Sequence, residues 1–264
     1  LGLTLERTGR DAEALSSFEQ ASRLLTDATD PQLAAGASCL RLGRFDDAIV
    51  WLEGVLSTHP SIEQAWAMLI DAHASTENHD AAETSFYLAQ DALSDPSASV
   101  LVAMSGSLLS RQLLDRATWC AREALKLDSG VQGGRLRLAS ALVASGNGQQ
   151  ASQILLQELR EDPGNVQALL LHADVLAESG RTNEACIKLH RVLELEPANV
   201  DAHIRAGQFA MEDERWEEAF IAWGLVRRLY PSHPTASLHV AQTLLAMHRP
   251  EAARPLLKEY LDSM

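Results

Sequence analysis

Apolar and polar residues are arranged along this chain in blocks that predict pairs of short amphipathic helices. The segment 61–96 shows the pattern most clearly. Its first half places apolar or half-apolar residues at i, i+3, i+4 and i+7, the spacing of one helical face. These positions are Trp66, Leu69, Ile70 and His73. We therefore expect a first helix, called helix A, whose face packs into a core.

A polar turn at 77–80 follows, and the apolar spacing then resumes at Ala82, Phe86 and Ala89. This predicts a second helix, helix B, which ends at Pro96 because the residue before a proline avoids helical backbone angles. Two helices joined by a short turn form an antiparallel hairpin.

The hairpin pattern repeats along the whole chain. Alanines recur at steps of 34 residues, with a single step of 35, at Ala14, Ala48, Ala82, Ala117, Ala151, Ala185, Ala219 and Ala253. A fixed period of this length indicates a stacked array, in which each unit buries its apolar face against its neighbours. The predicted repeats are 1–28, 29–62, 63–97, 98–131, 132–165, 166–199, 200–233 and 234–264, forming one solenoid over 1–264.

Two further positions recur with the same period. Helix A carries a small residue where it approaches helix B, as at Gly36 and Gly207, with Ile70 as the clear departure. The turn between the helices carries glycine in four repeats, where a left-handed backbone favours it. Other residues take this turn position in the remaining repeats, namely Glu77, Gln112, Glu214 and His248.

The repeat pattern resembles that of the tetratricopeptide repeat family. The shared features are a Leu-Gly pair or its equivalent on helix A, an alanine followed by a bulky residue on helix B, and a proline that closes the repeat. The resemblance covers the full chain. It implies an all-α fold, a right-handed superhelical solenoid of antiparallel helix hairpins, and a role in binding other proteins. It also implies that helix A lines the concave side of the array.

The glycine-rich segment 129–134 lacks the closing proline, and glycines raise the free-energy cost of starting a helix there. Either it is a hinge between the first and last four repeats, or it is an irregular turn within one continuous superhelix.

The chain starts within a helix A and ends with helix B at Met264 without a polar capping helix. Solenoid ends need such a cap, so we expect a fragment of a longer protein or ends covered by self-association.

Composition narrows the choice of partners. The net charge is −14, from 36 acidic and 22 basic residues, and the basic residues do not cluster. Nucleic acid and anionic membranes both require a basic footprint, so neither is expected as a partner. Membrane insertion is not expected either, because the longest apolar stretch, 99–109, is too short to span a bilayer.

No catalytic, cofactor-binding or metal site is predicted. The chain contains none of the common catalytic or nucleotide-binding motifs, and the histidines lack the i, i+4 pairing of metal ligands. His73 and His172 fall in core positions of helix A. The three cysteines show no metal spacing, which favours a reducing compartment such as the cytoplasm unless an upstream targeting segment is missing.

The resemblance places the candidate partner-binding residues beside the core positions of helix A. This predicted groove is largely apolar with scattered charges, which suits an amphipathic helix or an extended apolar peptide. Alternatively, much of its apolar row packs between adjacent A helices. The candidate residues are Leu33, Leu40, Arg41, Asp71, Val102, Leu109, Leu136, Arg137, Leu170, Asp174, Ile204, Arg205, Leu238 and Gln242.

The leading hypothesis from the sequence is a non-catalytic scaffold or adaptor that holds a partner peptide or helix in this groove. The alternative is a recognition domain of a larger enzyme or of an envelope or secretion assembly protein, such as a glycosyltransferase-associated repeat region. A sensor for a small molecule or metal has no motif behind it. Because one repeat fold serves many functions, the sequence does not select the partner.

Overall fold

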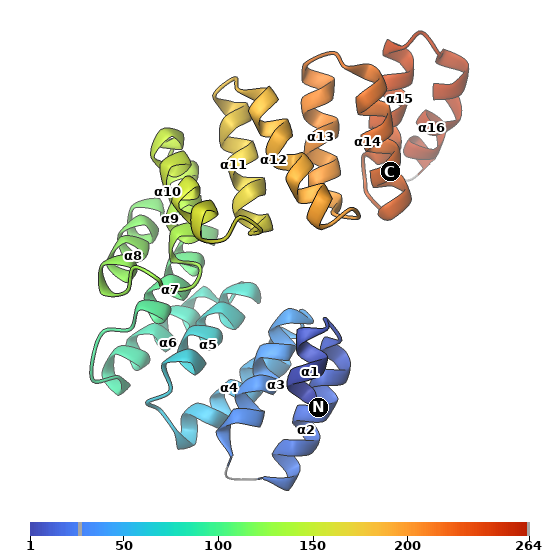
Figure 1. Ribbon diagram of the computed structural model, residues 1–264. Coiled ribbons are helices and arrows are strands. Elements are labelled where there is room, and N and C mark those ends of the chain that lie inside the picture. Colours follow the sequence, from blue (N-terminus) through green and yellow to red (C-terminus); the bar gives the residue numbers. More distant parts are fainter. Residues whose placement is uncertain (26–27, 263–264) are drawn as a thin grey trace. The chain divides into compact units, whose positions relative to one another are not determined.

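The computed structural model describes residues 1–25 and 28–262, and the described residues fold into helices and connecting turns (Figure 1). The all-α fold expected from the sequence is confirmed. The chain divides into two compact units, Leu1–Gly146 and Asn147–Met264, each with its own core. The predicted helix end at Met264 lies outside the described residues.

The first unit contains nine helices within the described residues. Its A helices are α1 (Gly2–Arg7), α3 (Thr29–Arg41), α5 (Glu63–Ser75), α7 (Ala98–Ser110) and α9 (Gly134–Ala144). Its B helices are α2 (Asp11–Leu24), α4 (Phe45–Thr58), α6 (His79–Ala92) and α8 (Leu114–Leu127).

The second unit contains seven helices within the described residues. Its B helices are α10 (Gly148–Glu161), α12 (Thr182–Leu195), α14 (Trp216–Leu229) and α16 (Pro250–Asp262). Its A helices are α11 (Val166–Glu178), α13 (Val200–Glu212) and α15 (Ala236–Ala246). In both units most helices pack chiefly on their neighbours in the chain, and in the first unit α5 and α7 also pack on each other.

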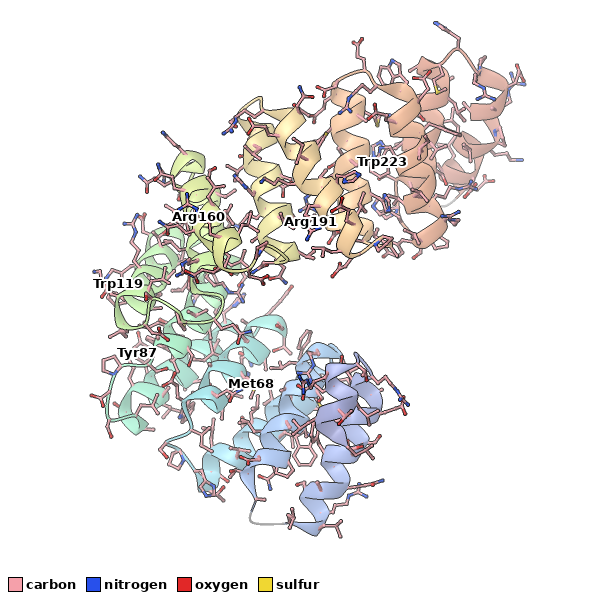
Figure 2. All side chains as sticks on the ribbon, in the orientation of Figure 1. Met68, Tyr87, Trp119, Arg160, Arg191 and Trp223 are labelled. Carbon is pink, nitrogen blue, oxygen red and sulfur yellow. The ribbon has the colours of Figure 1, made fainter. Side chains whose placement is uncertain are left out.

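The recurring alanine of helix B occupies the most closely packed place in each repeat. All eight alanines are fully buried, with no exposed surface at all. Nearby, helix A approaches so closely that a Cβ added to Gly207 of α13 would lie 2.6 Å from Nε1 of Trp223, a residue of α14 (Figure 2). A Cβ on Gly36 would lie 3.1 Å from Leu52. Small residues on one helix and large ones on the other therefore fill the interface together.

The turn between helices A and B has the same backbone conformation in every repeat. Its key residue has a positive φ of 57–76° whether or not it is glycine. The glycines are Gly9, Gly43, Gly146 and Gly180, and the other residues are Glu77, Gln112, Glu214 and His248. The left-handed turn residue predicted from four glycines is thus present in all eight turns. Because non-glycine residues also adopt this conformation, it is imposed by the hairpin.

Several A helices begin with a side-chain cap that fixes where the helix starts. The side chains of Asn165 and Asn199 accept hydrogen bonds from the backbone N–H of Ala168 and Ala202, at 3.0 and 2.9 Å. Ser97 caps α7 in the same way, accepting from Val100 N–H at 3.1 Å. Each cap satisfies one of the free amide groups at a helix start.

Helix α9 begins differently, at the segment 129–134 that the sequence marks as a hinge or an irregular turn. Its N-cap, Gly133, is left-handed with φ 74°, and Gly134 packs so closely that a Cβ would lie 2.6 Å from Val131. Glycine is therefore favoured at both places, by backbone conformation at Gly133 and by close packing at Gly134. The hinge and the single continuous array over 1–264 both stay predictions.

Replacing Ala185 by Leu should overpack the α11–α12 interface, because this position has no free space. We expect the free energy of unfolding to fall by about 1–3 kcal/mol. Asn183→Leu, at an exposed position of the same helix, is the matched control and should change stability little. Urea unfolding of both variants measures the difference, and equal stabilities would contradict the packing account.

Replacing Glu77 by Gly should stabilise the first unit. A left-handed conformation costs a non-glycine residue about 1–2 kcal/mol, part of which is offset by the greater freedom of glycine in the unfolded chain. We expect a net gain of about 0.5–1 kcal/mol in the free energy of unfolding. Gly43→Ala, at the equivalent turn, should lower the free energy of unfolding by a similar amount. A loss of stability in Glu77→Gly would show that the turn is not strained.

Candidate interaction surfaces on the A helices

The predicted site residues lie on the A helices of both units. In the first unit they come from α3, α5, α7 and α9, and in the second from α11, α13 and α15. Only two are exposed, Arg41 and Gln242, and Val102 is buried with 9% exposure. The remainder are half-buried: Leu33, Leu40, Asp71, Leu109, Leu136, Arg137, Leu170, Asp174, Ile204, Arg205 and Leu238.

The half-buried apolar residues pack partly into the cores beneath them. Leu33 and Leu40 contact the main core of the first unit, and Leu109 contacts a second cluster around α7 and α8. In the second unit Leu170 and Ile204 contact the cores around α12 and α14. Each of these side chains supports the fold with one side and leaves the other partly exposed.

The charged site residues of the first unit include a loose pair that spans three successive A helices. The Arg137 guanidinium of α9 lies across Gly106 of α7, where a Cβ would come within 2.9 Å of Arg137 Cζ. It reaches Asp71 of α5 at 3.8 Å, too far for a hydrogen bond. Both side chains are about two-fifths exposed, at 42% and 43%. Burial raises the pKa of Asp71, and Arg137 opposes that rise.

Arg41, at the end of α3, ties the first three helices together. Its guanidinium contacts Glu6 of α1 at 2.9 Å and Asp11 of α2 at 2.7 Å. It also donates a hydrogen bond to Ser38 at 3.1 Å. With these partners around it, Arg41 holds the hairpin in place and retains little capacity for a ligand.

In the second unit Arg205 and Asp174 form a tight pair between α13 and α11. Two guanidinium nitrogens donate to the two carboxylate oxygens at 2.7 and 3.0 Å, the bidentate geometry that gives the strongest such contacts. The two residues are 31 positions apart, just under one repeat, so they face each other on successive A helices. Both residues were predicted as site residues from the sequence, but their contact was not predicted. Their separation of 31 residues is the signal that could have indicated it.

Gln242 belongs to a second polar group of the same unit, built around an aromatic stack. Its side-chain oxygen lies 3.0 Å from Nδ1 of His239, and the His239 ring stacks on Trp223 with centroids 4.1 Å apart. Burial lowers the pKa of His239, with the Gln242 contact opposing. His239 is therefore held by the stack on Trp223 and by its polar contact with Gln242.

The buried histidines and cysteines serve packing. His172 is 3% exposed, contacts Ser152 at 2.9 Å, and has its pKa lowered to about 4, mainly by burial. Burial also raises the pKa of the Cys120 thiol to about 11. Across residues 1–25 and 28–262, no three His, Cys, Asp or Glu side chains gather where they could hold a metal ion. The same residues include no helix of the length and apolarity that a membrane crossing needs.

The protein is a helical repeat protein, defined by hairpins that recur every 34 or 35 residues, a fully buried alanine in each B helix and a left-handed turn in each repeat. Comparison with known proteins gives the family. Two models, both described as tetratricopeptide repeat, match residues 1–32, 33–97 and 136–189. The chain belongs to the tetratricopeptide repeat family. Proteins of this family are generally non-catalytic scaffolds for protein interactions.

Solved structures of tetratricopeptide repeat proteins share the fold at low sequence identity. A tetratricopeptide repeat protein from Parabacteroides merdae is 14% identical with a TM-score of 0.64, and the match covers 92% of this chain and 96% of that one. PilF from Pseudomonas aeruginosa is 20% identical with a TM-score of 0.63, over 82% and 96% of the two chains.

A third structure matches almost the whole of this chain. It is the Cut9–Hcn1 hetero-tetramer of APC/C, at 16% identity and a TM-score of 0.77, covering 99% of this chain and 52% of that one. No curated protein sequence matches the chain.

The two Arg–Asp pairs on the A helices should differ in strength. A double-mutant cycle on Arg205 and Asp174 should give a coupling of about 1 kcal/mol, because the pair is bidentate and mostly buried. The Arg137 and Asp71 cycle should give less than about 0.5 kcal/mol. Urea unfolding of the single and double alanine variants measures both, and equal couplings would show that Arg137 is as fully engaged as Arg205.

Proposed function

We propose that this protein is a non-catalytic adaptor that binds a peptide or helix of a partner protein on its A helices. The observation that carries the proposal is the loose Arg137–Asp71 pair in the first unit. At 3.8 Å neither group completes a hydrogen bond to the other, and both are substantially exposed. The Asp71 carboxylate can therefore accept hydrogen bonds from the N–H groups of a peptide, and the Arg137 guanidinium can donate hydrogen bonds to its C=O groups.

The surroundings of the pair support a mixed polar and apolar contact. Gly106, on the helix between them, carries no side chain, which lets the Arg137 guanidinium lie across α7, where a bound peptide can contact it. Leu109 and Leu136 lie half-buried on α7 and α9. A peptide whose backbone contacts the polar pair can place apolar side chains against these leucines.

The test is selection of peptides from a random library displayed on phage, with the whole chain as bait. Affinities of the enriched peptides are then measured by calorimetry. Arg137→Ala should weaken their binding at least about tenfold, because the peptide loses charge-assisted hydrogen bonds. Arg23→Ala, which removes an exposed arginine from α2 in the same unit, is the matched control and should change affinity little.

Leu136→Asp gives an independent check on the apolar half of the contact, and circular dichroism confirms that helical content is retained. Loss of binding in both variants supports the proposal. Enriched peptides that bind Arg137→Ala and Leu136→Asp as tightly as the unmodified protein would overturn it.

A further inference from the structure

A departure from the repeat pattern occurs between α6 and α8, on the B helices of the first unit. The linker 93–97 between α6 and α7 is one residue longer than the linker 59–62 between α4 and α5. This extra residue is the 35-residue step in the alanine series. Helix α7 packs mainly on α5 and α8 and makes little contact with α6, whereas α5 packs well on α4.

The residues at the α5–α6 interface add to the departure. Where other repeats have a small residue, α5 has Ile70, which is fully buried. The bulky residue opposite it, Phe86, is only half-buried, whereas the equivalent Leu52 is fully buried. Because Ile70 fills the space, the Phe86 ring remains at the surface between α6 and α8.

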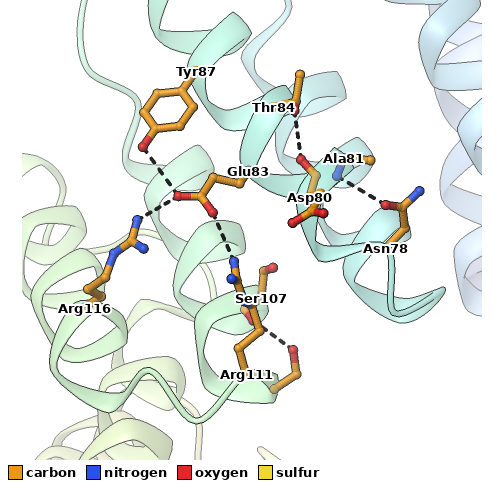
Figure 3. A network of polar contacts seen from close by, with 10 residues as sticks. Asn78, Asp80, Ala81, Glu83, Thr84, Tyr87, Ser107, Arg111 and Arg116 are labelled. Carbon is orange, nitrogen blue, oxygen red and sulfur yellow. Dashed lines mark hydrogen bonds and ion pairs between the residues drawn. The ribbon is translucent and has the colours of Figure 1, made fainter.

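One end of the gap between α6 and α8 is fixed by ion pairs centred on Glu83 (Figure 3). The Glu83 carboxylate of α6 accepts hydrogen bonds from Arg111 and Arg116, both at 3.0 Å. These contacts hold the pKa of Glu83 below its usual value, with Arg116 contributing most. Tyr87 lies one turn further along α6, with its hydroxyl 3.4 Å from Glu83.

Beyond this fixed end the two helices enclose an apolar cleft of about 390 Å³. Phe86, Leu93 and Leu101 line it together with Trp119 and Leu127 of α8. Trp119 is 56% exposed and Leu127 is 51% exposed, so two large apolar side chains lie at the surface side by side in one cleft. Figure 2 shows Trp119 projecting from α8.

The charges that line the cleft indicate what kind of segment fits it. Both are acidic: Asp95 in the linker and Glu123 on α8. Glu123 pairs with Lys126 at 2.7 Å, and Asp95 makes no ion pair within the described chain. A second copy of this chain, with a net charge of −14, is a poor match for acidic surroundings.

We propose that this cleft is a second docking site, separate from the A-helix surface, for a basic amphipathic segment of a partner protein. The segment inserts an apolar side chain beside Trp119 and places lysine or arginine near Asp95 and Glu123. The Trp119 indole offers both an apolar wall and a face that attracts a cation. The proposal does not depend on the function assigned to the A helices.

The probe is a synthetic amphipathic peptide of leucine and lysine at helical spacing, with a leucine–glutamate peptide of the same apolar pattern for comparison. Binding to the full chain is followed by the emission of Trp119, isolated by subtracting the response of Trp119→Phe. The leucine–lysine peptide should shift that emission to shorter wavelength and protect Trp119 from acrylamide quenching.

Trp119→Ser should weaken the leucine–lysine peptide about tenfold, and Asp95→Asn should weaken it about threefold. Val50→Ser is the matched control, because Val50 occupies the same repeat position on α4, is 71% exposed and lies outside this cleft. It should bind like the unmodified protein.

Three outcomes would overturn the proposal. The first is equal affinity of Trp119→Ser and Val50→Ser, which would show nonspecific attraction of a cationic peptide to an acidic protein. The second is equally tight binding of the leucine–glutamate peptide. The third is a dimer in sedimentation equilibrium that Trp119→Ser dissociates, which would make a second copy the occupant.

Discussion

The structure depends on one constraint, the close approach of the two helices of each hairpin at a single alanine of helix B. All eight of these alanines are fully buried. That approach fixes the angle at which helix A leaves helix B, and it requires the left-handed turn residue between them. It also decides which side chains of helix A turn toward the core and which remain for other contacts. The interaction surfaces are therefore consequences of a packing rule.

Much of the fold could be predicted from the sequence because the pattern is repeated eight times. Periodic alanines located the B helices, and four glycines predicted a left-handed turn that Glu77 and its three counterparts also adopt. Even the irregular repeat was marked by its longer step. Local rules of this kind act within a few residues, so they can be read directly from the chain.

The surfaces were less predictable, because they depend on contacts between repeats. The sequence selected Asp71, Arg137, Asp174 and Arg205 without showing that the second pair is bidentate and the first is loose. Nor could it show that Trp119 is more than half exposed. The two pairs differ in the distance between guanidinium and carboxylate, which is 3.8 Å in one and 2.7 Å in the other. Such distances depend on how helices more than 30 residues apart in the chain pack on each other.

The longer linker between α6 and α7 has a consequence for how such a chain can change. In a compact domain an inserted residue at the core disturbs many elements at once. Here each helix packs on helices of its own repeat and of the adjacent repeats, and the alanines on either side, Ala82 and Ala117, are as fully buried as the rest. A solenoid thus tolerates an insertion that remodels one stretch of surface, and new binding specificity can be added to one repeat while the others keep theirs.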